Sequence, residues 1–218
     1  MSFGTFLMGV LMCAASATAE ALPKPAVDLP PEKSGNPARA VLAGGCFWCT
    51  EAVIEQIDGI IDVESGYAGG AAETANYRAV CNGDTGHAEA IQITYDPKKI
   101  TFGELMQILF TSIDPTQKDR QGNDAGTQYR SAIFYENEDQ KKVAEAYIKQ
   151  LDDAKIYPKP IATTVEKLPK FYPAEAYHQN YAEQNPNQPY IVSCSLPKVQ
   201  KIRQLFKDRL KSTTRPAQ

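Results

Sequence analysis

The sequence predicts an α+β fold, a two-layer βαβ sandwich with a mixed, mostly antiparallel sheet and long functional loops. Three observations support this prediction. Strand-like and helix-like segments interleave along the chain, the strands are few, and the loops between them are long. The 218 residues are 43% hydrophobic and 22% charged, which suits one domain with a sizeable core. No internal repeat points to a second domain.

The segments before and after the predicted domain, residues 38–211, have distinct compositions. Residues 1–19 carry no charge, and an apolar run too short to span a bilayer leads to Ala17-Thr18-Ala19, a small-residue cleavage site. We expect a signal peptide cleaved near Ala19 and a secreted, periplasmic protein; a disordered leader, or lipidation at Cys13, is the alternative. Residues 20–37, with five prolines, predict an extended arm, and residues 212–218 a frayed tail.

Strands are predicted where apolar and β-branched residues alternate or cluster between turn-forming residues. The clearest alternation places Glu89 on the same face as Ile91, Ile93 and Tyr95. The expected strands are residues 38–43, 60–67, 88–95, 128–135 and 163–168. The segments 66–85 and 117–126 are rich in turn-forming or polar residues and are predicted to be loops.

Helices are predicted from capping residues followed by apolar residues at helical spacing. Thr101 with Glu104 forms a capping box, and Asn137 with Gln140 caps the next helix. The inward positions of these two helices are Phe102, Leu105, Ile108 and Leu109, then Val143, Tyr147 and Leu151. Further helices are expected at residues 46–57, 174–184 and 196–210.

The segment 44–49, Gly-Gly-Cys-Phe-Trp-Cys, lies at a predicted strand-to-helix junction. A helix N-terminus stabilises a thiolate, the nucleophilic form of cysteine. We interpret Cys46 as a nucleophile in an apolar pocket walled by Phe47 and Trp48; a buried structural cysteine beside core aromatics is the alternative. Cys46 and Cys49 also form a C-x-x-C pair, so a general dithiol–disulfide oxidoreductase remains an alternative function.

Two loop-to-strand segments add polar groups suited to catalysis. A carboxylate on an apolar strand face is desolvated, which raises its pKa, so Glu89 could remain protonated and act as a general acid. The alternative is a solvated strand end. Tyr129 follows a polar loop, and its hydroxyl could donate to a developing oxyanion without titrating near neutral pH. The alternative is an ordinary strand tyrosine.

Three segments, 45–48, 83–89 and 122–131, resemble in sequence and order the A-type peptide methionine sulfoxide reductases. The resemblance extends over about residues 38–190. It implies a stereospecific reductase of methionine S-sulfoxide, free or in proteins. The roles that it implies are a nucleophile at Cys46, an acid at Glu89, hydroxyl donors at Tyr77 and Tyr129, a supporting carboxylate at Asp124, and walls around the substrate methyl group at Phe47 and Trp48.

The implied reaction leaves Cys46 as a sulfenic acid, which a second thiol converts to a disulfide. It requires no metal or organic cofactor, only an external dithiol such as thioredoxin. Family members often carry the resolving cysteine directly after a Pro-Tyr, but here Ile191 follows Tyr190 and Cys194 lies three residues later. Cys194 and Cys49 both remain candidates, whereas Cys81 resembles a non-catalytic spectator.

Charge and cysteine usage exclude several other classes. The net charge of −3 gives no basic field for nucleic acid. With two histidines and no second C-x-x-C, a zinc ribbon is not expected. The four cysteines after the leader are too few for a disulfide scaffold. We expect a monomer; a secreted binding domain without turnover is the remaining alternative.

Overall fold

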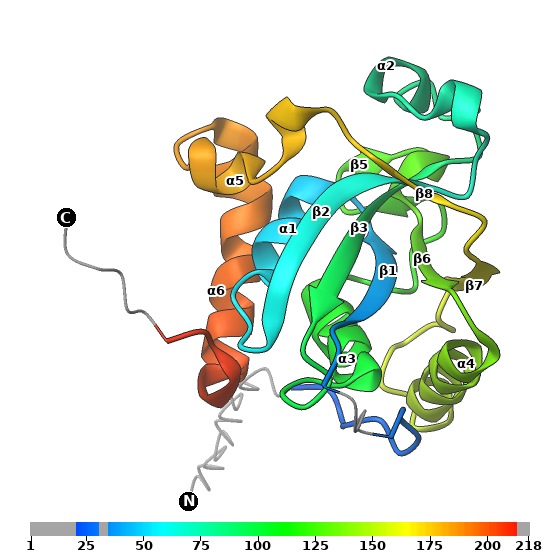
Figure 1. Cartoon of the computed structure of the whole chain (residues 1–218), viewed down its shortest axis with the longest axis vertical. Coiled ribbons are helices and arrows are strands. Elements are labelled where there is room, and N and C mark those ends of the chain that lie inside the picture. Colours follow the sequence, from blue (N-terminus) through cyan, green and yellow to red (C-terminus); the bar gives the residue numbers. More distant parts are fainter. Residues whose placement is uncertain (1–20, 31–34, 213–218) are drawn as a thin grey trace, which may run out of the picture.

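The computed structural model describes residues 21–30 and 35–212, in which helices cover one face of a six-stranded mixed sheet (Figure 1). The strand order is β7-β6-β1-β3-β2-β8. Its strands are β1 (Ala38–Gly44), β2 (Ile60–Ala68), β3 (Ala88–Tyr95), β6 (Ser131–Tyr135), β7 (Thr164–Lys167) and β8 (Phe171–Pro173). The longer helices are α1 (Phe47–Ile54), α3 (Phe102–Ser112), α4 (Glu138–Asp153) and α6 (Leu196–Leu205). The predicted α+β class is confirmed.

The strand pairing explains how a βαβ unit forms around an antiparallel strand. Both β1 and β2 pair antiparallel with β3, so they run in the same direction, and the chain crosses between them through α1. β6 pairs antiparallel with β1 and parallel with β7, and α4 makes that second crossover. The two crossovers therefore place helices against the sheet, while antiparallel pairing joins the central strands.

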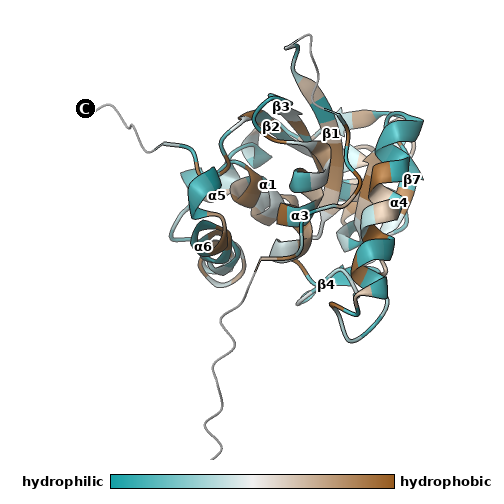
Figure 2. Ribbon diagram, turned by 90° about the horizontal axis from the view of Figure 1, so that it is seen from below, coloured by the Kyte–Doolittle hydropathy of each residue, from teal (hydrophilic) through white to brown (hydrophobic). Residues whose placement is uncertain are grey.

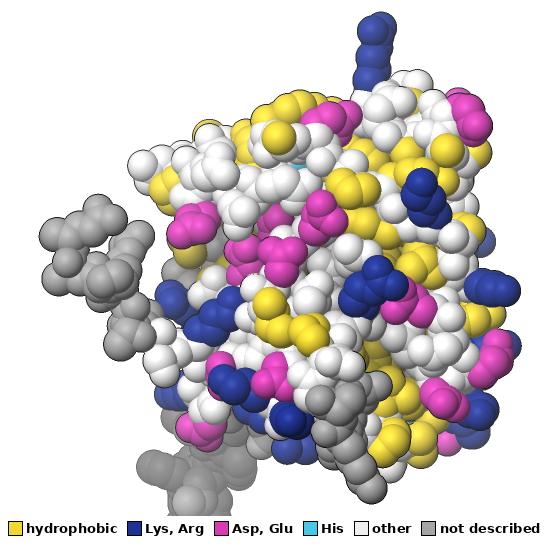
Figure 3. All heavy atoms as spheres, viewed as in Figure 1, with side chains coloured by type: hydrophobic (Ala, Val, Ile, Leu, Met, Phe, Trp, Pro, Cys, Tyr) yellow, Lys and Arg dark blue, Asp and Glu magenta, His cyan; other side chains and the backbone are white. Residues whose placement is uncertain are grey.

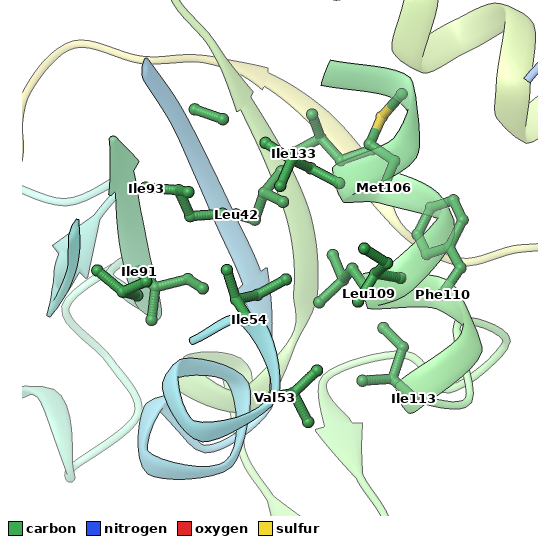
Figure 4. Close-up of a cluster of buried hydrophobic side chains, with 14 of the residues drawn as sticks. Leu42, Val53, Ile54, Ile91, Ile93, Met106, Leu109, Phe110, Ile113 and Ile133 are labelled. Atoms are coloured by element: carbon green, nitrogen blue, oxygen red, sulfur yellow. The ribbon is translucent and has the colours of Figure 1, made fainter. Parts of the chain in front are cut away.

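Side-chain alternation divides the strands between two buried clusters. On the helix-covered face, Leu42, Ile93 and Ile133 meet apolar side chains of α1 and α3 (Figure 4). The opposite face holds mainly small residues, with Phe134 and Phe171 as its large members. The hydrophobic residues of the helices accordingly face inward, and their outer surfaces are hydrophilic (Figure 2). Glu89 lies on the helix-covered face with Ile91, as the alternation predicts.

The predicted helix caps form as expected. Thr101 Oγ1 accepts the Glu104 N–H at 3.2 Å, and Glu104 Oε2 accepts the Thr101 N–H at 3.1 Å, which completes the capping box. Asn137 Oδ1 accepts the Gln140 N–H at 2.9 Å. Each cap satisfies backbone donors that the first helical turn leaves free, so the starts of α3 and α4 are determined locally.

Several predicted boundaries are wrong, and short elements account for most of the differences. The strand predicted from 128 begins at Ser131, because residues Thr127–Tyr129 form a 3-10 turn. The helix predicted over 174–184 is interrupted by Asn180, whose φ of 54° is left-handed. The pieces on either side are the 3-10 turn Ala176–His178 and α5 (Tyr181–Gln184).

The C-terminal helix and the two predicted loops also differ from expectation. A π-helical turn at Ile191–Ser195 precedes α6, which ends at Leu205. The loops contain a 3-10 turn (Ala72–Thr74), α2 (Tyr77–Val80), and a small hairpin of β4 (Arg120–Gln121) and β5 (Asp124–Ala125). The edge strand β8 was not predicted. These elements are too short for a periodic sequence signal.

The described parts of the proline-rich arm, residues 21–30 and 35–37, have no helix or strand, and residues 21–30 lie against α3 and α4. Asp28 Oδ1 accepts the Gly103 N–H at 2.9 Å, and its other oxygen accepts the Thr101 hydroxyl. The Tyr147 hydroxyl donates to the Pro23 carbonyl at 2.8 Å. The predicted signal peptide and most of the predicted tail lie outside the described residues. In the described part of the chain, no helix has the length and hydrophobicity to span a membrane.

Candidate functional site

The junction between β1 and α1 places Cys46 at the N-cap of α1. The turn requires Gly45, whose φ is 89°; a Cβ there would also meet the Gln121 side chain at 2.6 Å. The Cys46 side chain is only 6% exposed. The strand-to-helix turn predicted from the sequence therefore holds this sulfur in a buried position.

Cys46 and Cys49 lie in the first turn of α1, where the Cys49 N–H donates to the Cys46 carbonyl at 3.1 Å. Burial raises the pKa of Cys46, and the neighbouring Cys49 thiol and Glu89 carboxyl raise it further. The interaction with Cys46 lowers the pKa of Cys49 to about 7 against the effect of burial, with help from the charge of Lys198. Burial thus disfavours a Cys46 thiolate in the free protein, and the thiolate at Cys46 stays a prediction.

Glu89 takes the first backbone donor at the N-terminus of α1. The Phe47 N–H, the first of α1, donates to Glu89 Oε2 at 3.0 Å instead of to sulfur. Glu89 is 2% exposed, and burial raises its pKa to about 8, opposed by the Phe47 hydrogen bond and assisted by the charge of Asp124. A pKa of about 8 keeps this carboxyl mostly protonated at neutral pH.

Two tyrosines from separate short elements lie near Glu89 and Cys46. Tyr77 begins α2, and its N–H donates to Glu175 Oε1 at 2.9 Å. Tyr129 ends the Thr127–Tyr129 turn. Burial raises the pKa of both hydroxyls, and the charges of Glu89 and Cys46 raise both further, so the two hydroxyls remain protonated donors beside those groups.

Asp124 is linked to Cys49 through Tyr190. The sequence predicted no role for this tyrosine. The Tyr190 hydroxyl donates to Asp124 Oδ2 at 2.5 Å. Cys49 Sγ lies 3.9 Å from the same hydroxyl. Tyr190 comes from the turn before α6, so only the folded chain brings it to β5 and α1.

Aromatic rings form a wall on the other side of the junction. Trp48 stacks on Tyr181, with ring centroids 3.9 Å apart and planes 11° apart. Its Nε1–H donates to His178 Nδ1 at 3.1 Å. His178, 1% exposed, also packs against Phe47 at 5.0 Å between ring centroids. Sequence reasoning missed His178 and Tyr181, since nothing in the local pattern distinguishes them.

The model of the peptide methionine sulfoxide reductase family matches residues 38–210. The chain belongs to this family. Peptide methionine sulfoxide reductase MsrA 2 of Synechocystis sp. is 45% identical over 215 residues, covering 97% of each chain. The enzyme of the same name from Mesorhizobium japonicum is 53% identical over 168 residues, covering 77% of this chain and 86% of that one.

Solved structures agree with this assignment. Mxr1 from Saccharomyces cerevisiae, in its reduced form, matches with a TM-score of 0.65 and 37% identity over 73% of this chain and 91% of that chain. Methionine sulfoxide reductase A of Corynebacterium diphtheriae matches with a TM-score of 0.61 and 33% identity, covering 78% and 85%. This reductase is thus an oxidoreductase that reduces methionine sulfoxide with thiols, and the general dithiol–disulfide alternative is not favoured.

The remaining cysteines of this reductase lie in different surroundings. Cys194 is half-buried on the π-helical turn, and its sulfur is 3.6 Å from the Ser193 hydroxyl. Cys81 is exposed at the end of α2, near the Tyr77 hydroxyl. All four cysteines in the described part of the chain are free thiols. Within residues 21–30 and 35–212, no group of His, Cys, Asp or Glu side chains is suited to bind a metal ion.

Proposed function

We propose that the chain reduces the S epimer of methionine sulfoxide, free or in proteins, through a sulfenic acid on Cys46. The observation that carries this proposal is that Cys46 and Glu89 meet at the N-terminus of α1. There, the Phe47 N–H binds a buried Glu89 carboxyl whose pKa is about 8, beside the Cys46 sulfur. A nucleophile and a neutral acid that meet at one point are what sulfoxide reduction requires.

The acid is needed because sulfoxide oxygen is a poor leaving group until it is protonated. Glu89, mostly neutral at pH 7, supplies that proton, and the Tyr77 and Tyr129 hydroxyls donate hydrogen bonds to the same oxygen. Phe47 and Trp48 enclose the substrate methyl group. Only one of the two sulfoxide epimers can then place its oxygen at the acid and its methyl group between the rings while the sulfur faces Cys46.

The nucleophile forms by exchange of one proton within the cysteine pair. Cys46 passes its proton to the neighbouring Cys49 thiolate, which leaves Cys46 as the thiolate. Cys46 then attacks the sulfoxide sulfur and forms a sulfur–sulfur bond, while the protonated oxygen departs as water. That water attacks the Cys46 sulfur, the sulfur–sulfur bond breaks with its electron pair going to methionine, and Cys46 is left as the sulfenic acid.

Cys49 is the proposed resolving thiol. It lies three residues after Cys46 in the first turn of α1, and its pKa of about 7 supplies a thiolate at neutral pH. Attack of Cys49 on the sulfenic sulfur forms the Cys46–Cys49 disulfide and releases water. Cys194, half-buried and in contact with the Ser193 hydroxyl, is the second candidate.

An external dithiol of the thioredoxin type would return the disulfide to two thiols, and the chain would act as a monomer without a metal or organic cofactor. The apolar leader, residues 1–19, supports export to the periplasm, and an exported enzyme needs a reductant on that side of the membrane. N-terminal sequencing of the protein from a periplasmic fraction tests this; an intact Met1 would contradict cleavage near Ala19.

Reduction of the separated sulfoxide epimers with dithiothreitol tests the function. The wild type should reduce the S epimer and leave the R epimer, and Cys46→Ser should reduce neither. Failure of the wild type on both epimers would overturn the assignment, and an active Cys46→Ser would overturn the nucleophile.

A further inference from the structure

His178 is a buried histidine to which the proposed reaction assigns no step. It ends the 3-10 turn Ala176–His178 and is 1% exposed. Its Nδ1 accepts the indole N–H of Trp48 at 3.1 Å, whereas its Nε2 completes no hydrogen bond within the described structure. Both histidines of the chain are buried, and almost no histidine surface is visible in Figure 3. Within the described residues, the one hydrogen bond of this ring is therefore made with the wall of the substrate pocket.

The chemistry of the two rings determines the direction of this bond. An indole nitrogen can only donate, so His178 Nδ1 must be unprotonated when it accepts from Trp48. Burial lowers the pKa of His178 against the opposing charge of Glu175, so the imidazole is neutral at neutral pH. A neutral imidazole with a free Nδ1 carries its proton on Nε2, which lies 3.9 Å from Glu175 Oε2. The carboxylate thus favours the tautomer that accepts from Trp48.

Packing leaves the imidazole ring of His178 little freedom to turn. Its centroid lies 5.0 Å from the ring centroid of Phe47, 4.4 Å from that of Tyr77 and 4.1 Å from that of Tyr177. A side chain that is already ordered by its neighbours loses little conformational entropy when it accepts a hydrogen bond. His178 is therefore a pre-oriented acceptor for the indole.

The Trp48 indole needs this acceptor because stacking alone does not set its rotation. The indole and the Tyr181 ring are stacked, with centroids 3.9 Å apart and planes 11° apart. Stacking fixes the plane of the indole but depends little on rotation within that plane. A hydrogen bond is directional, so the bond from Nε1 to His178 sets that rotation. The two contacts together determine which edge of the indole faces the pocket.

We propose that His178 is a positioning residue, whose hydrogen bond to Trp48 sets the rotation of the indole and thereby the shape of the methyl pocket. It touches no reacting atom and acts through the pocket wall. The inference rests on the proposed function only in assigning Trp48 to the substrate methyl group. When the bond is lost, substrate binding should weaken and the chemical step should change little.

A nitrogen–proton correlation spectrum reports this bond without any turnover. Trp48 is the only tryptophan of the chain, so the spectrum contains a single indole signal. In the wild type, the indole proton should exchange slowly with solvent, and a scalar coupling across the hydrogen bond should connect Trp48 Nε1 with His178 Nδ1. His178→Leu should move the indole proton upfield and speed its exchange.

Two replacements of His178 distinguish its hydrogen bond from its volume. Asparagine is smaller, but its side-chain oxygen can take the place of Nδ1 and accept; leucine has nearly the volume of histidine and cannot accept. His178→Leu should raise the half-saturating concentration of methionine S-sulfoxide in single turnover about three- to tenfold, the worth of one neutral hydrogen bond, with the maximal rate within about twofold. His178→Asn should keep both the indole signal and the half-saturating concentration close to those of the wild type. A residue that only fills space would give the reverse order.

A control and a double variant separate this role from general damage to the fold. Tyr177→Phe is the matched control, since Tyr177 belongs to the same turn, packs on His178 and is 59% exposed, and it should change neither quantity. In a Trp48→Phe background, which has no indole N–H, His178→Leu should add nothing further to the half-saturating concentration.

A wild-type indole proton that exchanges freely and shows no coupling to His178 overturns the proposal, whether or not the variants fold. The reverse order of His178→Asn and His178→Leu overturns it too, as does a full additional effect of His178→Leu in the Trp48→Phe background. Loss of the bond in His178→Leu with an unchanged half-saturating concentration also overturns it, because the bond would then not shape the pocket. Failure of the wild type on both sulfoxide epimers, with the indole signal as expected, would instead overturn the proposed function.

Discussion

Replacing Glu89 with glutamine tests the buried acid through both catalysis and stability. Glutamine keeps the shape of the side chain, and its amide oxygen can still accept the Phe47 N–H, so the junction between β1 and α1 should remain intact. What it removes is the acidic proton. General acids contribute roughly 10²–10⁴-fold to rate, and we expect a loss in that range for the first turnover.

The same substitution has a second consequence, because the pKa of Glu89 rises from an ordinary 4.5 to about 8 in the folded chain. The folded state holds this proton more tightly than the unfolded state. Wild-type stability therefore falls with rising pH between these values, by about 5 kcal/mol in total. Glutamine does not titrate. The free energy of unfolding of Glu89→Gln, relative to that of the wild type, should therefore increase by about 1.4 kcal/mol per pH unit across this window.

Urea unfolding of both proteins between pH 4.5 and 9 measures the stability difference, and rapid-quench single turnover measures the rate. Glu145→Gln, an exposed acid on α4, is the control and should follow the wild type at every pH. If the free energies of unfolding of Glu89→Gln and the wild type changed in parallel with pH, the conclusion that Glu89 is buried in its neutral form would be refuted. A first-turnover rate within about fivefold of the wild type would refute its role as the acid.

Three further outcomes follow from the geometry. Cys49→Ser should complete one turnover and then accumulate Cys46 as a sulfenic acid, which dimedone labelling and mass spectrometry detect; rapid disulfide formation in this variant would favour Cys194. Asp28→Ala should destabilise the fold by about 1 kcal/mol in urea, because it removes a cap-type contact at α3. Gly66→Ala should cost about 1–3 kcal/mol in the same assay, since its Cβ would collide with the Phe171 ring in the neighbouring strand.

Local rules predict the part of the site that is continuous in sequence. The glycine turn before Cys46 and the alternation around Glu89 place these two side chains correctly, because a strand-to-helix junction and a strand face are each determined by nearby residues. The capping box at Thr101 is local in the same way. Register in the sheet then brings the two segments together, with β3 beside β1.

The rest of the site depends on contacts between segments far apart in the chain. Tyr190 reaches Asp124 across 66 residues, and His178 reaches Trp48 across 130. These residues lie in or beside short turns of helix without a periodic pattern, so no local rule identifies them. The pKa of Cys46 depends on a distant segment in the same way, since the first backbone N–H of α1 is taken by Glu89 from another strand.

The most direct test of the account is one turnover without a reductant, read by mass spectrometry of the cysteines. Reduced protein is mixed with excess methionine S-sulfoxide, quenched, alkylated and digested with trypsin, which places Cys46 and Cys49 in one peptide, residues 40–78. We expect one methionine to form per chain, and this peptide to be lighter by two hydrogen atoms and closed to alkylation. Methionine formation that leaves both thiols of this peptide open to alkylation, or no methionine at all, would contradict it.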